Sequence, residues 1–323
     1  MTSPIMDDPH DPDADLAGEF PEEGDDDVVA QPSGSGAIRK PAAGLYIVAT
    51  PIGNAGDITL RALDILRGVD AIACEDTRVT GKLLRRYGIR TRMLPYHDHN
   101  AAKMRPVLLD KVANGQSIAL VSDAGTPLVS DPGFKLVREA KDRGLALTHL
   151  PGANAAITAL VLSGLPSDRF LFGGFLPSKS AARRTELDLF RTLPATLIFY
   201  ESAQRLAEML GDVTASLGAR EVAVARELTK LFEEVRRGPA AELAQHYTDK
   251  GPPKGEVVVV VGPPAADAAA NDAADMDSLL RQALTGGMSV RDAAAHVATI
   301  TGQPKKQVYA RALQLGTGGD DPA

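Results

Sequence analysis

The chain has 323 residues, of which 44% are hydrophobic and 24% are charged. This length allows two domains with tails, and the apolar content supplies material for sizeable cores. One cysteine excludes an internal disulfide framework, and no apolar run reaches the roughly 18–20 residues of a membrane span. The first residues do not form a secretory leader either, so we expect a cytoplasmic protein.

The net charge of -7 arises at one end of the chain. Residues 1–30 contain eleven of the 42 acidic residues and no Lys or Arg, which leaves 35 basic against 31 acidic side chains elsewhere. This mild positive balance suits a polyanionic partner, although many such domains bind no nucleic acid. Residues 1–43 are rich in Asp, Pro, Gly and Ser, so we expect a disordered acidic tail.

Apolar runs alternate with amphipathic stretches from Leu45 to Pro151. This alternation is typical of a mainly parallel sheet with helices on both faces, and it predicts an N-terminal α/β domain over residues 44–152. Cys74 lies in one of the apolar runs and is interpreted as a small buried side chain. The predicted strands are Leu45–Thr50, Ala71–Glu75, Arg92–Tyr96 and Ser117–Asp123, and the predicted helices are Leu60–Arg67, Lys82–Tyr87, Ala101–Val112 and Phe134–Arg143.

Strands follow one another more often in residues 153–262, which predicts a mixed α+β domain. Residues 263–275 have the composition of a linker. Residues 276–316 are predicted to form two or three short helices with a helix-turn-helix-like junction at Thr301–Gln303, followed by a tail over 317–323. The elements predicted in the second domain are helices Ala153–Leu162, Ala182–Phe190 and Arg205–Leu217, and strands Phe170–Phe175, Thr196–Ser202, Glu221–Glu227, Leu231–Gly238 and Glu256–Gly262.

Four segments rich in Gly, Pro or acidic residues follow predicted strands or join the two halves. Ligands of open α/β sheets bind beyond the carboxyl ends of the strands, so these segments are candidates for a binding site. Each also has a structural alternative: a turn, a helix cap with a surface ion pair, a capped loop, or a hinge. The segments are, in that order, Thr50–Asn54, Glu75–Arg78, Ser122–Gly133 and Pro151–Asn154.

Two further strand ends carry polar side chains, in Tyr200–Ser202 and Arg226–Lys230. They fit either a cleft or a rim ion pair. Tyr96–Asn100 contains two His with an Asp between them, but no third ligand has suitable spacing, so no metal site is predicted. The chain also has no G-x-S-x-G motif, and Cys74 is no candidate nucleophile.

Taken together, these strings resemble the tetrapyrrole methylase superfamily, most closely its ribosomal branch of bacterial 16S rRNA (cytidine-2'-O)-methyltransferases. The matching strings run in order between Leu45 and Val261, and they include TPIGN, EDTR, YHDHN, LVSDAGTPLVSDPG, GLPSDRF, LIFYES, VARELTK and KGEVVVVV. The chain departs from the branch at Ala49, where Pro is frequent, and at Ala153-Asn154, which replaces Pro-Cys or Pro-Ser. Its acidic tail is also longer than usual.

The resemblance implies two α/β domains that enclose S-adenosylmethionine in the cleft between them, and a homodimer. It implies a cytidine in the decoding region of the small ribosomal subunit as the substrate. The residues that it implies for cofactor binding are Pro51, Gly53, Ser122, Asp123, Ala124, Gly125, Thr126, Pro127, Pro151, Gly152, Ala153, Phe199, Tyr200, Arg226, Glu227, Leu228 and Thr229.

A ribose hydroxyl is a poor nucleophile at neutral pH, so methyl transfer benefits from a general base. Our hypothesis takes Asp76 or Glu75 as this base, with Arg78 and Lys230 holding phosphate or the developing oxyanion. The C-terminal helices are predicted to grip rRNA phosphates through Arg281, Arg291, Lys305, Lys306 and Arg311. Two alternatives stay open: a methyltransferase acting on a porphyrinoid, and a non-catalytic RNA-binding ribosome assembly factor.

Overall fold

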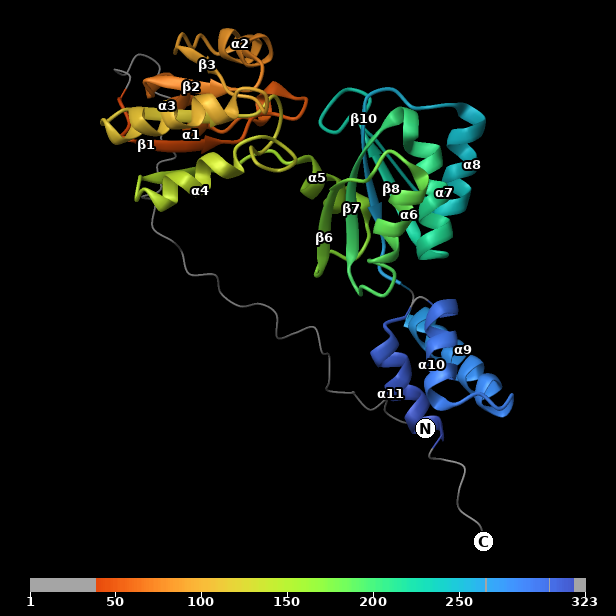
Figure 1. Ribbon diagram of the computed structural model, residues 1–323. Coiled ribbons are helices and arrows are strands. Elements are labelled where there is room, and N and C mark those ends of the chain that lie inside the picture. The colour runs from red at the N-terminus through yellow and green to blue at the C-terminus, as the bar shows by residue number, and fades with distance from the viewer. Residues whose placement is uncertain (1–38, 265, 302, 317–323) are drawn as a thin grey trace, which may run out of the picture. The chain divides into compact units, whose positions relative to one another are not determined.

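The computed structural model describes residues 39–264, 266–301 and 303–316 (Figure 1). Its first sheet has the strand order β3-β2-β4-β1-β5, and all its strands pair in parallel. This confirms the predicted parallel sheet. Its elements are β1 Gly44–Val48, η1 Ala55–Asp57, α1 Leu60–Gly68, β2 Ala71–Cys74, α2 Thr77–Arg86, β3 Met93–Pro95, α3 Ala101–Ala113, β4 Ser117–Val121, α4 Phe134–Asp142 and β5 Leu147–Leu150.

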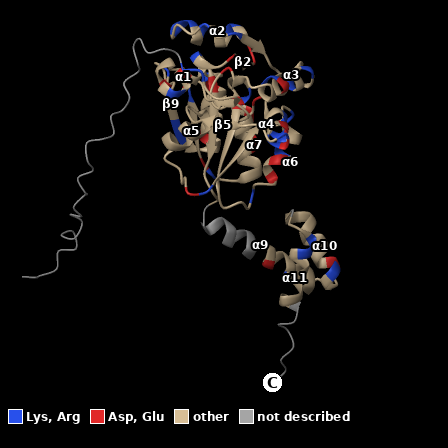
Figure 2. Ribbon diagram, turned by 90° about the vertical axis from the view of Figure 1, so that its left-hand side faces the viewer, with Lys and Arg blue, Asp and Glu red and all other residues tan. Residues whose placement is uncertain are grey.

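Helices cover both faces of this sheet. Successive side chains of a strand point to opposite faces, and here both sets are apolar and pack against helices. Leu45 and Ile47 of β1 pack with α3 and α4, whereas Val48 packs with α1 and α2. Cys74 is fully buried in the same sheet, as predicted, and burial raises the pKa of its thiol to about 11. Most Lys and Arg of these helices are exposed, and several of them lie along α2 (Figure 2).

The second sheet has the order β6-β7-β10-β8-β9 and is mixed, as predicted. Only β6 and β7 pair in parallel, while β10 runs antiparallel to both β7 and β8, and β9 antiparallel to β8. Its elements are α5 Ala155–Ser163, β6 Phe170–Phe175, α6 Ser180–Asp188, β7 Thr196–Ser202, η2 Ala203–Arg205, α7 Leu206–Leu217, β8 Glu221–Arg226, β9 Glu234–Pro239, α8 Ala240–Lys250 and β10 Glu256–Val261.

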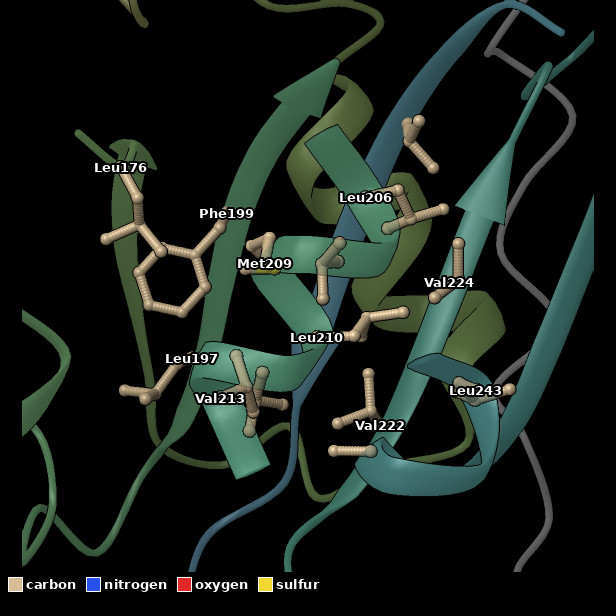
Figure 3. Packing of buried hydrophobic residues seen from close by; sticks show 14 of the residues in the cluster. Leu176, Leu197, Phe199, Leu206, Met209, Leu210, Val213, Val222, Val224 and Leu243 are labelled. Atoms are coloured by element: carbon tan, nitrogen blue, oxygen red, sulfur yellow. The ribbon is translucent and has the colours of Figure 1, made fainter. Parts of the chain in front are cut away.

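The main core of the second sheet lies between the strands and α7 (Figure 3). Leu197 and Phe199 of β7 and Val222 and Val224 of β8 point into this core. The alternate residues of the same strands, such as Ile198, pack on the other face with α5. The alternation therefore decides which side chains of β7 can reach a site outside the core.

Helix boundaries differ from the prediction where a cap or composition decides them. α2 begins at Thr77, five residues earlier than predicted, because the Asp76 side chain caps it by accepting from the Arg78 amide. α5 begins at Ala155 because Asn154 caps it in the same way. α8 was not predicted at all. α9 spans Ala266–Thr285 and so begins inside the predicted linker, whose many alanines have a high helix propensity.

The C-terminal helices have a small core of their own. α10 Val290–Thr301 and α11 Lys305–Gly316 follow α9, as predicted, and Leu280, Val297 and Val308 pack between the three helices. None of the helices among the described residues is long and apolar enough to cross a membrane. The predicted disordered tail lies largely outside the described residues, as does the tail predicted over 317–323.

Candidate functional site

The loops that follow β1, β2 and β4 meet at the carboxyl edge of the first sheet. Thr50 and Gly125 form an isolated antiparallel bridge, with N···O distances of 2.8 and 3.0 Å in the two directions. The Asp76 amide donates to Asp123 Oδ1 at 3.1 Å. The structure thus brings together three segments that sequence analysis selected separately.

Loops of the second sheet contact the same place. The Asn54 amide donates to Thr229 Oγ1 at 3.0 Å, and the Thr126 hydroxyl donates to the Ala153 carbonyl at 3.1 Å. A Cβ added at Gly53 would lie 2.6 Å from Lys230 Cγ and 3.0 Å from the Leu228 carbonyl oxygen. Only glycine permits this close approach between the Thr50–Asn54 loop and the loop after β8.

A cavity of about 800 Å³ lies between these loops, a size typical of sites for small organic cofactors. Apolar walls come from Ile52, Val258 and the Tyr200 ring, which makes edge contacts with Phe172 and Phe175. Of the implied cofactor residues and Lys230, those that line this cavity are Asp123, Ala124, Gly125, Thr126, Tyr200, Glu227, Leu228 and Lys230.

Left-handed backbone is concentrated in the two loops that form this cavity. Within residues 39–264, 266–301 and 303–316, the non-glycine residues with positive φ are Leu128 (76°), Ser130 (61°), Glu227 (48°) and Thr229 (65°). Such conformations raise the energy by about 1–3 kcal/mol each and persist only where the surroundings fix them. Their concentration here supports a function for both loops. These conformations could not be predicted from the residue types, because none of the four is Gly or Asn.

Carboxylates surround the loop that follows β2. Burial, together with the nearby charges of Asp123, Asp131, Asp98 and Asp76, raises the pKa of Glu75. Burial also raises the pKa of Asp131, against a hydrogen bond with Ser122 that lowers it. Asp131 lines the cavity, so its raised pKa makes it a candidate for proton transfer, whereas Glu75 lies one residue before Asp76, whose amide binds Asp123 of the cavity wall.

The pKa of Asp76 is shifted in the opposite direction, below its usual value. The Arg78 guanidinium donates to both of its carboxylate oxygens, at 2.6–3.1 Å, and the Arg78 amide donates to one of them. These hydrogen bonds lower the pKa of Asp76 to about 2. Asp76 is therefore a helix cap and an ion-pair partner, while the side chain of Arg78 is 86% exposed.

Several predicted residues lie away from the cavity. The Phe199 ring lies in the core shown in Figure 3, so it is its neighbour Tyr200 that lines the cavity. Arg226 pairs with Glu234 of β9. Pro51, Gly53 and Ser122 line an adjoining cavity instead. The predicted residues that line neither cavity are Glu75, Asp76, Arg78, Pro127, Pro151, Gly152, Ala153, Phe199, Arg226 and Thr229.

Several further residues line the cavity of about 800 Å³ but were not predicted as site residues. Asp131, Asn154 and Glu201 all lie in selected segments but were not chosen as site residues. Glu201 is buried, and its Oε1 accepts from the Ser202 amide and from Arg205, whereas its Oε2 has no hydrogen-bond partner among the described residues. A buried, unpartnered carboxylate oxygen in a cavity wall is ready to accept from a ligand.

The whole Pro252–Glu256 segment was also missed. It leads into β10, whose first residue is Glu256. Because β10 is antiparallel to β7 and β8, the beginning of β10 lies beside the ends of those strands. The rule that sites lie at carboxyl ends of parallel strands overlooks such a segment. Its Pro-Pro-Lys-Gly sequence, which resembles the other Gly- and Pro-rich loops, was the available signal.

The two His of the Tyr96–Asn100 segment, His97 and His99, contact each other and neighbouring residues of their own segment. Their rings pack edge to face at 5.9 Å, and Asn100 Oδ1 accepts from the His97 amide. In the described part of the chain, no group of three or more His, Cys, Asp or Glu is placed to hold a metal ion.

Comparisons with known proteins agree with this architecture. The family model "Tetrapyrrole (Corrin/Porphyrin) Methylases" matches residues 44–244, more than half of the chain, and "RsmI C-terminal HTH domain" matches residues 270–316. Among solved structures, diphthine synthase (TM-score 0.54) and cobalt precorrin-4 methyltransferase (TM-score 0.52) are each 16% identical and cover 68% of this chain. The matches span 89% of the diphthine synthase chain and 94% of the cobalt precorrin-4 methyltransferase chain, and at this identity they show the fold alone.

Curated relatives are much more similar in sequence. "Ribosomal RNA small subunit methyltransferase I" of Mesorhizobium japonicum is 54% identical over 84% of this chain and 92% of the relative. The protein of the same name from Escherichia coli O157:H7 is 48% identical over 84% of this chain and 94% of the relative. The chain therefore belongs to the tetrapyrrole methylase family, and within it to the group of proteins named ribosomal RNA small subunit methyltransferase I.

Proposed function

We propose that this chain transfers a methyl group from S-adenosylmethionine to 16S rRNA, at the ribose 2'-hydroxyl of a cytidine in the decoding region. The names of its relatives support the small-subunit rRNA as the substrate. The observation that carries the proposal is the cavity of about 800 Å³ between two loops with left-handed backbone. The choice of a cytidine and of its 2'-hydroxyl follows from the family resemblance of the sequence.

The residues of the cavity fit S-adenosylmethionine by their chemistry. The cofactor carries an adenine ring, ribose hydroxyls and an ammonium group. Tyr200, Ile52 and Val258 offer apolar surface for a ring, while Asp123 and the free Oε2 of Glu201 can accept from hydroxyl or ammonium donors. When bound, the sulfonium supplies both the methyl group and the leaving group.

Replacing Gly125 by Val is expected to weaken cofactor binding at least tenfold. Gly125 has φ +77°, and an added Cβ would lie 3.3 Å from Ile52 Cγ2, so the change distorts the bridge to Thr50 and narrows the cavity. Isothermal titration calorimetry with S-adenosylmethionine measures the effect. Gly115→Val is the matched control, because Gly115 has φ +84° and nothing within 4 Å of the added Cβ. It should lose similar stability but bind the cofactor normally, and equal affinities for both variants would contradict the placement.

Among the two carboxylates considered as base, we assign the role to Glu75. A base must be ionised yet basic enough to accept a proton, and the pKa of Glu75 is raised, whereas that of Asp76 is about 2. Asp123 and Asp131, whose charges contribute to this shift, line the cavity. Lys230 also lines the cavity, and we propose that it holds a phosphate or oxyanion there, in exchange for its present ion pair with Glu227 at 3.0 Å.

The function is tested by mapping ribose methylation on small subunits from cells that lack this protein. We expect one unmodified cytidine 2'-hydroxyl in the decoding region, and its methylation when the purified chain and S-adenosylmethionine are added. Methyl transfer to a porphyrinoid but not to subunits would favour the small-molecule alternative. No calorimetric signal with S-adenosylmethionine would favour the non-catalytic assembly factor.

The C-terminal helices are proposed to bind rRNA phosphates, with one change to the predicted set. Arg311 donates to both carboxylate oxygens of Asp277 at 2.6–2.8 Å, which joins α11 to α9. Because Arg311 is already paired with Asp277, we leave it out of the proposed phosphate-binding set. No ion pair engages the other four cations in the part of the chain that the structure describes: Arg281, Arg291, Lys305 and Lys306. The match to a C-terminal helix-turn-helix model at residues 270–316 supports this role.

A homodimer is proposed as the assembly. α5 exposes Ile157, Leu162 and Val161, the last of them 71% exposed. Apolar side chains gathered on one helix are typical of an interface. Sedimentation of the full chain at micromolar concentration should give the mass of a dimer. We also propose a cytoplasmic location, because the proposed rRNA substrate belongs to that compartment.

A further inference from the structure

A second cavity, of about 700 Å³, adjoins the proposed cofactor cavity. We call it the α2 groove. One side is formed by Pro51 and Gly53 of the loop after β1, and the other by Lys82, Arg85 and Arg86 of α2. The two cavities share Ile52, Asp123, Ala124, Lys230 and Glu256, so a molecule in the groove touches the wall of the cofactor cavity.

The chain around α2 is strongly and exclusively basic. Between Asp76 and Asp98 it contains six Lys or Arg and no Asp or Glu. Figure 2 shows the resulting blue segments along α2. Within the described residues, Arg78 is the member of this run that forms an ion pair, whereas no ion pair engages Lys82, Arg85 or Arg86.

Packing of α2 directs these cations outwards. Leu84, Gly81 and Thr80 form its buried side, and Leu84 joins the core beneath the first sheet. Lys82, Arg85 and Arg86 are exposed. Three exposed cations on the wall of a concave surface, with no carboxylate of their own element to neutralise them, favour a polyanion. Elsewhere many Arg side chains are paired, for example Arg105 and Arg143 with Glu139.

We infer that the α2 groove is where the RNA strand carrying the target nucleotide binds. Its phosphates contact Lys82, Arg85 and Arg86, and the ribose reaches the wall shared with the cofactor cavity at Asp123 and Lys230. The inference rests on the proposed function and adds the route by which the substrate enters. Arg90 and Arg92 are also exposed, in the segment between α2 and β3, so the positive charge extends beyond α2 and suits a strand of several nucleotides better than a small molecule.

The test is the salt dependence of RNA binding by the full chain. Lys82→Gln/Arg85→Gln/Arg86→Gln is compared with wild type by fluorescence anisotropy, with a labelled 16S rRNA fragment that contains the decoding region. Each lost phosphate contact makes the negative slope of log K against log salt shallower by roughly 0.7–0.9, so the magnitude of the slope should fall by about 2 to 3. Affinity at 0.1 M salt should fall on the order of 10- to 100-fold. Calorimetry should show unchanged S-adenosylmethionine affinity, because none of the three residues lines the cofactor cavity.

A matched control removes the same charge from the opposite face of the first sheet. Lys135, Arg138 and Lys141 are exposed on α4, whose Leu136 and Ala140 pack in the other core. Their replacement by Gln should leave the slope within experimental error of wild type. Equal slopes for the two triple variants, whether both fall or neither does, would overturn the inference.

Methyl transfer separates this inference from the proposed function. If the wild-type chain methylates small subunits while the slopes are equal, the function stands and the groove assignment fails. If it methylates no rRNA, the function fails, and the slopes still decide whether α2 binds RNA. With both correct, the α2 variant should raise KM for small subunits at least tenfold and leave kcat within about twofold.

Discussion

Glu75→Gln is expected to lower kcat for rRNA methylation by about 10²- to 10⁴-fold, the usual contribution of a positioned general base. The amide has nearly the same shape as the carboxylate but cannot accept the proton of a ribose hydroxyl. Affinity for S-adenosylmethionine should stay within about threefold of wild type, because Glu75 does not line the cofactor cavity. The measurement is single-turnover methylation of small subunits with both substrates saturating.

The pH dependence gives a second readout of the same role. The pKa of Glu75 is raised by burial and by neighbouring carboxylates, so the active, ionised form is lost as the pH falls through that raised value. The acidic limb of the rate profile should therefore lie above the value near 4.3 of a free glutamate. For stability the sign is reversed: ionising a carboxyl whose folded pKa is raised opposes folding, so the Gln variant should melt at or above the wild-type temperature near pH 7.5.

Asp76→Asn serves as the control for this prediction. Asn keeps the cap of α2, since Asn and Asp are similarly good N-caps, but it loses the ion pair with Arg78, so the variant should melt only slightly below wild type and change turnover much less than Glu75→Gln does. If Glu75→Gln kept near-normal turnover while Asp76→Asn lost it, the assignment of the base would be reversed.

Asp212→Ala is expected to lower the free energy of unfolding by about 3–5 kcal/mol, the usual effect of breaking a buried ion pair. Asp212 of α7 is buried and accepts from Ser180 Oγ at 2.9 Å, from Arg183 Nε at 2.6 Å and from Arg184 Nε at 2.5 Å. Arg183 is 0% exposed, so the truncation leaves a buried cation without its main partner. Burial opposes ionisation of Asp212, but the hydrogen bonds outweigh it and lower its pKa.

Differential scanning calorimetry measures this loss as a decrease in Tm of about 6–20 °C. Asp249→Ala is the control, because Asp249 lies on the exposed surface of α8 and accepts from Gln245 alone among the described residues. Its removal should change stability by no more than about 0.5 kcal/mol. A shift of less than 2 °C for Asp212→Ala would show that the buried network contributes little.

Much of the fold could be predicted because the signals were local. The apolar runs at Leu45, Ser117 and Glu256 have the length and composition of buried strands, and all three form strands in the structure. The beginning of α2 was misplaced because the capping role of Asp76 competed with an interpretation as site chemistry. α9 extends into the predicted linker because alanines favour a helix even in a segment with the composition of a linker.

The site could be predicted only in part, because its geometry depends on contacts between distant segments. The loops at Thr50 and Gly125 were found from their Gly and Pro residues, and the structure joins them directly. The left-handed conformation of Glu227 and the unpartnered oxygen of Glu201 have no signature in the sequence. Choosing Tyr200 over Phe199 was within reach, since the period of two along β7 puts these side chains on opposite faces.

The central claim is that the cavity between the Ser122–Gly133 loop and the Arg226–Lys230 loop holds S-adenosylmethionine. A crystal structure of the full chain grown with S-adenosylmethionine tests it most directly. We predict the cofactor within the cavity, in contact with Asp123, Gly125 and Tyr200. Cofactor bound at another place, with this cavity filled only by water, would contradict the account.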